Sequence, residues 1–188
     1  AAGIPELKQE KSYNGSLGMT WAAAKGLNIT ADGYWVNVVD RVVLSGQFDG
    51  SDANLDASLR SSMAALNVSL AQFFANAVNT TNMGIDVVVD YTKKVRENKL
   101  KILLTGNYQH MTINKVNVPA KLSGSNFLRQ TFLSDRERKF ILASAPNAKA
   151  ALNVEYEIKK TTLGARVTYF GKVVLLGYGQ DGLGINPT

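Results

Sequence analysis

The stretch LNVEYEIKKTTLGARVTY, residues 152–169, alternates apolar and polar residues on both sides of a short turn. Successive side chains of a strand point to opposite sides, so Leu152, Val154 and Tyr156 would share one face and the residues between them the other. After the turn at 159–161 the alternation resumes. The pattern predicts an antiparallel hairpin with one apolar and one polar face.

Similar runs recur along the chain, and the connections between them are short and long in turn. Strand-like runs are predicted at residues 10–21, 26–48, 72–91, 100–112, 152–158 and 163–169. The short connections are 24–26, 93–99 and 159–161, and the long ones are 49–70, 116–147 and the tail from Gly177. Tight turns at one end and long loops at the other are typical of a membrane β-barrel wall. We therefore predict an all-β fold: an antiparallel meander of about six strands, part of a larger transmembrane β-barrel, with short helices in the long outer loops.

The long loops carry helical signals. Apolar residues from Leu55 to Leu66 recur at helical spacing, with Ser51 or Asp52 as the cap, so residues 51–70 are either a short helix in an outer loop or simply a loop. A second helical piece is predicted at 134–144.

The apolar pattern of one predicted strand also indicates an irregularity. In the run 26–48 the apolar phase passes from Leu27 and Ile29 to Tyr34, which is a slip of one residue. Such a slip requires a bulge, and glycine is the usual residue there, so a bulge is predicted near Gly33.

Composition excludes several classes of protein. The 188 residues carry a net charge of +6, but the basic residues are spread out, which argues against a nucleic-acid partner. No apolar run is long enough for a transmembrane helix, and the absence of cysteine excludes disulfides and thiolate zinc sites. With His110 as the single histidine, no catalytic constellation can be assembled. We therefore expect no enzyme activity, no cofactor and no metal site.

The charged residues of the strands restrict their orientation. Lys or Arg on a lipid face near the middle of the bilayer costs about 2–4 kcal/mol. The residues expected to line a wet lumen are Asp86, Asp90, Glu155, Glu157 and Arg166. Across the last hairpin, Arg166 is expected to sit opposite Glu155 or Glu157.

Several strings, in order, resemble the barrel of TonB-dependent outer-membrane receptors. They are PELK at 5–8 with EKSYN at 10–14 and Gly18, GLNITAD at 26–32 with DRV at 40–42, and FFANA at 73–77 with GID at 84–86. DRER at 135–138, PNAK at 146–149 and YFGKV at 169–173 are similar to the siderophore-receptor branch that includes the colicin I receptor.

The resemblance implies a bacterial outer-membrane location, contact with outer-membrane lipid and uptake of a ferric siderophore or similar scarce ligand. Energy would come from the TonB complex acting through a plug domain. Receptors of this kind are barrels of about 22 strands with a plugged lumen. We therefore expect residues 1–188 to be a partial barrel domain without plug or closing strands, an interior or processed piece that can self-associate through its strand edges.

The ligand is expected at the outer mouth, where guanidinium groups suit anionic chelates. The candidate contacts are Arg60, Arg129, Arg136 and Arg138, although lipopolysaccharide phosphates or solvent are equally compatible partners for them. The alternative function is a soluble β-sandwich module that binds a ligand such as a glycan.

Overall fold

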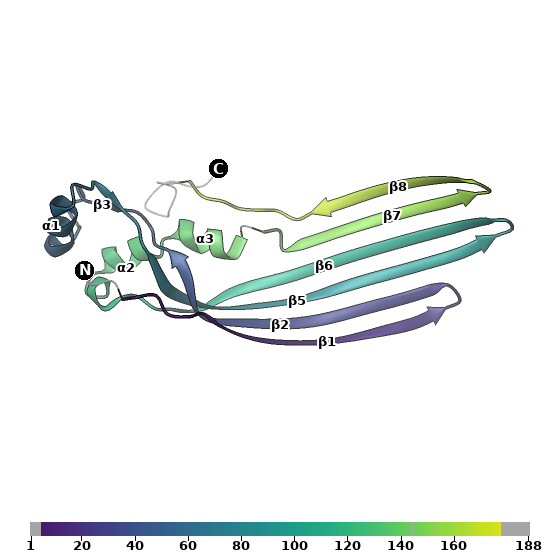
Figure 1. Ribbon diagram of the computed structural model, residues 1–188, viewed down its shortest axis with the longest axis horizontal. Helices are drawn as coiled ribbons and strands as arrows, with labels where there is room; N and C mark the ends of the chain where they lie inside the picture. Colours follow the sequence, from purple (N-terminus) through teal and green to yellow (C-terminus); the bar gives the residue numbers. More distant parts are fainter. Residues whose placement is uncertain (1–4, 144, 178–188) are drawn as a thin grey trace.

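The computed structural model describes residues 5–143 and 145–177 and contains one long antiparallel sheet (Figure 1). Its six strands are β1 (Lys11–Ala24), β2 (Leu27–Leu44), β5 (Phe74–Val95), β6 (Asn98–Val116), β7 (Ala148–Ile158) and β8 (Thr161–Phe170). Each strand pairs with the next in this order, which confirms the predicted all-β meander. Within the described residues the sheet is open, with β1 and β8 as its edges. The tail from Gly177 lies almost wholly outside the described residues.

Three tight turns lie together at one end of the sheet (Figure 1). Each contains a residue with positive φ: Gly26 at 78°, Arg96 at 59° and Lys159 at 54°. Two-residue hairpin turns require such backbone angles to match the twist of the strands. A Cβ at Gly26 would also lie 2.1 Å from the carbonyl oxygen of Thr92, so glycine is required there. The connection predicted at 93–99 is shorter than expected, because β5 and β6 continue up to a two-residue turn.

The pairing register divides the sheet into an apolar face and a polar face. The apolar face carries large side chains that are exposed: Leu17, Met19, Trp21, Trp35, Met83, Ile85, Leu104, Tyr108, Leu152, Leu163, Val167 and Tyr169. Contiguous apolar surface on this scale marks an interaction surface. In a barrel wall it is the surface that contacts lipid.

The predicted bulge near Gly33 is wrong. Gly33 pairs with Leu17 on one side and Ile85 on the other, without a break in register. The register between β2 and β5 shifts instead on both sides of Arg41, next to Asp40, whose φ is 57°.

The apparent slip of phase has another cause. Because the alternation continues through Gly33, Trp35 lies on the apolar face and Tyr34 on the polar face. Tyr34 covers Gly84 of β5, where an added Cβ would lie 2.3 Å from the tyrosine ring. These two adjacent aromatic residues thus lie on opposite faces of the sheet. The sequence pattern alone does not show which of them lies on the apolar face.

The long connections fold into an outer lobe, residues 45–73 and 117–143, at the end of the sheet opposite the turns (Figure 1). Its elements are β3 (Phe48–Asp49), α1 (Ala57–Ala65), β4 (Leu70–Ala71), η1 (Ala120–Leu122), α2 (Asn126–Phe132) and α3 (Asp135–Ala143). The two predicted helices are present as α1 and α3, whereas α2 was not predicted. The cap of α1 is Asp56, not Ser51 or Asp52, because Asp56 Oδ1 accepts hydrogen bonds from the backbone N–H groups of Ser58 and Leu59.

The buried core lies mainly in the outer lobe and on the part of β5 that it covers. Phe73 stacks on Phe48 and on Phe132, with ring centroids 5.8 Å and 5.9 Å apart. Aromatic stacking and aliphatic packing of this kind fix the two long connections against each other. No helix among the described residues has the length and apolar character needed to cross a bilayer.

Candidate functional site

A pocket of about 310 Å³ lies between the outer end of β2 and helix α3. Its walls are residues 41–45 of the chain and Arg136, Glu137, Phe140 and Ile141 of α3. Mostly apolar walls with a few charged groups are typical of ligand pockets. The pocket joins segments far apart in the sequence, so it depends on how the outer lobe packs on the sheet.

A bulge in β2 positions Arg41 at this pocket. The side-chain oxygen of Asn79 accepts a hydrogen bond from the backbone N–H of Asp40 at 3.0 Å, and the side-chain amide of Asn76 donates to the carbonyl of Asp40 at 2.6 Å. These bonds hold the positive φ of Asp40, which is unfavourable for a residue other than glycine. Bulges commonly redirect a side chain next to a binding site, and here the redirected residue is Arg41.

The hydrogen-bond partners of the Arg41 guanidinium are neutral. Its Nη1 lies 3.4 Å from the hydroxyl oxygen of Thr80 and 3.7 Å from the sulfur of Met111. The ion pairs seen in the described part of the chain do not include Arg41. A partly buried charge is stabilised by a partner of opposite sign. This group is therefore suited to receive an anionic part of a ligand.

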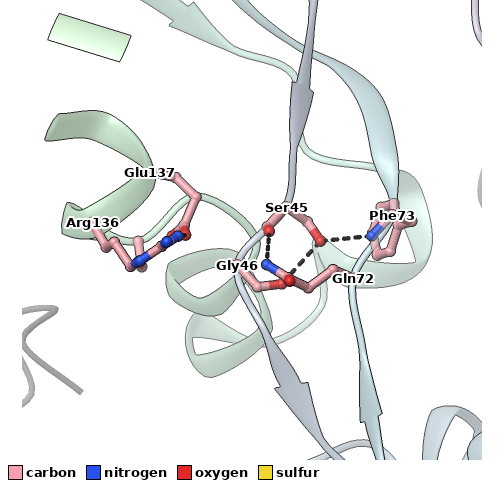
Figure 2. A network of polar contacts seen from close by, with 7 residues as sticks. Ser45, Gly46, Gln72, Phe73, Arg136 and Glu137 are labelled. Carbon is pink, nitrogen blue, oxygen red and sulfur yellow. Dashed lines mark hydrogen bonds and ion pairs between the residues drawn. The ribbon is translucent and has the colours of Figure 1, made fainter. Parts of the chain in front are cut away.

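The opposite wall carries a buried ion pair on α3 (Figure 2). Arg136 Nη1 lies 2.7 Å from Glu137 Oε1, and the Arg136 guanidinium lies 4.5 Å from the ring centroid of Phe140. The other carboxylate oxygen of Glu137 accepts a hydrogen bond from the Ser134 hydroxyl. Glu137 is only 6% exposed, so this network fixes the first turn of α3 rather than contacting bulk solvent.

Ser45 and Gly46 join the pocket wall to the rest of the outer lobe (Figure 2). The Ser45 hydroxyl accepts a hydrogen bond from the backbone N–H of Phe73 at 3.1 Å, and the side-chain amide of Gln72 donates to the Ser45 carbonyl at 2.9 Å. The backbone N–H of Gly46 donates to the carbonyl of Phe132 at 3.1 Å. The wall formed by residues 41–45 is therefore held from both long connections.

The other three arginines predicted as ligand contacts bind groups of their own loops. Arg60 donates to the carbonyls of Asp52 and Leu55, at 2.6 Å and 3.3 Å. Arg129 donates to the side chain of Asn126 at 2.5 Å, and Arg138 to the carbonyl of Leu133 at 3.3 Å. Of the four predicted arginines, Arg136 is the one that lines the pocket.

The register places the predicted lumen residues on the polar face: Asp86, Asp90, Glu155, Glu157 and Arg166. That this face lines a lumen stays a prediction. The expected position of Arg166 opposite Glu155 or Glu157 is wrong, because Arg166 pairs with Asn153. The partner of both glutamates is Lys101, whose Nζ lies 3.8 Å from Glu155 and 2.6 Å from Glu157.

Among the charged and aromatic residues of the pocket, three were missed as candidates: Arg41, Glu137 and Phe140. A signal for Arg41 was present, since VNVVDRVV at 36–43 interrupts the alternation with two adjacent charges. The pairing of Arg136 with Glu137 could not be inferred, because neighbouring charges on a helix usually face solvent. Among residues 5–143 and 145–177 no group of three or more His, Asp or Glu side chains could hold a metal ion.

Comparison with known proteins adds one finding. A family model described as TonB dependent receptor-like, beta-barrel matches residues 1–184. The search of curated proteins returns no match.

Proposed function

The chain belongs to the TonB-dependent receptor β-barrel family of the bacterial outer membrane, and from this premise we propose that its receptor imports a ferric siderophore or a similar anionic chelate. Members of this family are receptors and transporters that act with TonB, rather than enzymes. The open six-stranded sheet is then a section of the barrel wall, with its apolar face toward lipid and its polar face toward the lumen.

The pocket between β2 and α3 carries the proposal of an anionic ligand. It lies at the loop end of the sheet, which in a barrel of this kind faces the outside of the cell. Arg41 brings a guanidinium whose hydrogen-bond partners are neutral, and Arg136 brings a second one, balanced by Glu137. Planar guanidinium groups bind carboxylates and related anions through paired hydrogen bonds. We further propose Arg60, Arg129 and Arg138 as outer contacts met before the ligand reaches the pocket.

The test measures uptake of a radiolabelled ferric siderophore by cells that carry the full-length receptor. Arg41→Gln removes the charge, and Arg41→Lys keeps the charge but removes the fork of donors. We expect the glutamine variant to lower ligand affinity by about tenfold or more, as for the loss of a charged hydrogen bond, and the lysine variant to have a smaller effect.

The matched control is Arg96→Asn, in a turn at the other end of the sheet. It removes the same charge and places asparagine, which tolerates positive φ, at a position with φ of 59°. Equal affinity in the Arg41 variants and the control would contradict the proposed pocket. Loss of affinity only for neutral ligands would contradict the anionic class.

The described residues do not have the architecture that the alternative function, a soluble β-sandwich that binds glycans, requires. A sandwich requires two sheets packed face to face. In the described residues the second sheet is the two-stranded pair β3–β4, which lies in the outer lobe and leaves the apolar face of the main sheet exposed.

A further inference from the structure

The tight-turn end of the sheet is strongly basic. Its exposed cations are Lys25, Lys93, Lys94, Arg96, Lys159 and Lys160, which we call the basic turn end. The acidic residue within the three turns is Glu97. All three hairpins contribute to this group although they are distant in sequence, and Figure 1 shows their turns together at one end. The charge is therefore a property of this end of the wall and not of one loop.

An aromatic belt lies beside these cations on the apolar face. Trp21, Tyr91 and Tyr156 come four, two and three residues before Lys25, Lys93 and Lys159 in the sequence. Tryptophan and tyrosine favour the level of the lipid headgroups, where one end of the side chain is apolar and the other is hydrated. The belt places the nearby cations at or just beyond this level.

A second aromatic belt supports this assignment. Trp35, Tyr108 and Tyr169 lie nearer the outer lobe on the same face. Each residue of the second belt lies on the same strand as the pairing partner of a first-belt residue, six positions away from that partner. The pairs are Trp35 and Ile29, where Ile29 pairs with Trp21; Tyr108 and Ile102, where Ile102 pairs with Tyr91; and Tyr169 and Leu163, where Leu163 pairs with Tyr156. The constant offset corresponds to about 20 Å along each strand at about 3.4 Å per residue.

Both belts also step by two residues from one hairpin to the next. The row of Tyr91 lies two residues closer to the turns than the row of Trp21, and the row of Tyr156 two residues closer again. Strands that are tilted relative to the membrane require such a stagger to keep a belt level. The stagger of both belts therefore fits tilted strands, and the basic turn end lies beyond the belt that is nearer the turns.

We propose that the basic turn end binds the anionic headgroups of phospholipids in the periplasmic leaflet of the outer membrane. Lys93 carries the argument furthest, because it pairs with Leu100, falls on the apolar face and lies two residues beyond Tyr91. A lysine there extends its charged end to the headgroups while its carbon chain stays in contact with lipid. Lipid is favoured over a soluble anion because Lys93 continues the lipid-facing surface. The proposal rests on the orientation of the wall and not on which ligand the receptor carries.

The test is native mass spectrometry of the full-length receptor in detergent micelles, titrated with phosphatidylglycerol or with phosphatidylcholine. The variant Lys25→Gln/Lys93→Gln/Lys94→Gln/Lys160→Gln avoids the positions with positive φ and removes four charges. Each cation near an anionic surface contributes about 1 kcal/mol, or about fivefold in affinity, so we expect removal of four to lower the affinity for phosphatidylglycerol by at least about a hundredfold and to change that for phosphatidylcholine little. Added salt should weaken the wild-type binding, because it screens exposed charges.

The matched control is Lys8→Gln/Lys115→Gln/Lys121→Gln/Lys139→Gln, which removes four exposed lysines from the opposite end. An equal loss in the control, or equal affinity for the two lipids, would overturn the proposal.

Displacement of the lipid by an equal concentration of inorganic phosphate would identify a free-anion site instead. Loss of co-sedimentation with peptidoglycan in the turn variant, with lipid binding unchanged, would identify the cell wall as the partner. If the quadruple variant loses the heat-modifiable mobility of a folded barrel, Lys25→Gln/Lys160→Gln is measured in the same way, with about a 25-fold loss expected.

Discussion

At the scale of single residues, Gly46 determines how closely the outer lobe approaches the sheet. A Cβ at this position would lie 2.0 Å from the carbonyl oxygen of Thr131 and 3.2 Å from Glu137 Oε2. Contact at 2.0 Å with a backbone atom cannot be relieved by rotating a side chain. Either the end of α2 or the segment that follows β2 would have to move, and this would disrupt the hydrogen bond from the Gly46 N–H to the Phe132 carbonyl.

We therefore expect Gly46→Ala to loosen the pocket wall, at a cost of about 1–3 kcal/mol for overpacking. The measurement is limited trypsin digestion of the full-length receptor, followed at Arg129, Arg136 and Arg138. Cleavage there should be faster than in the wild type. Gly124→Ala is the control in the same lobe, because nothing lies within 4 Å of its added Cβ. Equal cleavage of the two variants would show that Gly46 tolerates a side chain.

At the scale of elements, the start of α1 depends on one carboxylate. Asp56 accepts hydrogen bonds from the Ser58 hydroxyl at 2.6 Å and from the Ser58 backbone N–H at 2.8 Å, and these bonds lower the pKa of Asp56 below its ordinary value. A pKa that is lower in the folded state stabilises the cap at pH values above the ordinary aspartate pKa. The stabilisation is lost as the pH falls through the lowered value.

Hydrogen exchange of the Ser58 and Leu59 amides tests this dependence. After correction for intrinsic exchange, protection in the wild type should fall as the pH drops below the ordinary aspartate range. Asp56→Asn keeps a capping side chain but cannot titrate, so its protection should not change with pH in that range. Asp56→Ala should lack protection throughout. A pH response that persists in the asparagine variant would assign it to another group, such as Asp49, whose pKa is also lowered by its bonds to Ser51.

The elements also show what the sequence could and could not predict. Alternation located the six strands of the main sheet, because a wall with one face in lipid enforces strict period two. It misplaced the bulge, since Tyr34 covers Gly84 while its neighbour Trp35 faces the other way. Helix α2 has only seven residues, too few for a clear helical period. The pocket was missed because it forms where Arg41 and α3 meet, and such tertiary contacts leave no periodic signal.

At the scale of the whole molecule, three surfaces indicate the same orientation of the sheet in the membrane. The outer lobe with its arginine-containing pocket lies at one end, the basic turn end at the other, and the apolar face with its two aromatic belts between them. Helices or loops would have to bury this apolar face in a soluble protein, yet the buried core of the described residues lies mainly in the outer lobe. The distribution of burial is that of a wall whose solvent on one side is lipid.

This orientation predicts opposite outcomes for two neighbouring leucines of β6. Leu104 lies on the apolar face between the aromatic belts, and Leu103 lies on the polar face, in register with Asp90 and Asn153. Leu104→Lys should destabilise the full-length receptor by about 2–4 kcal/mol, because a lysine would enter the lipid, whereas Leu103→Lys should have little effect because it would meet the polar face and Asp90. The measurement is urea unfolding in lipid vesicles, followed by heat-modifiable mobility. The two substitutions introduce the same side chain one position apart, so strand propensity and added charge are matched. A larger loss in Leu103→Lys would mean that the polar face, and not the apolar one, is turned toward the membrane.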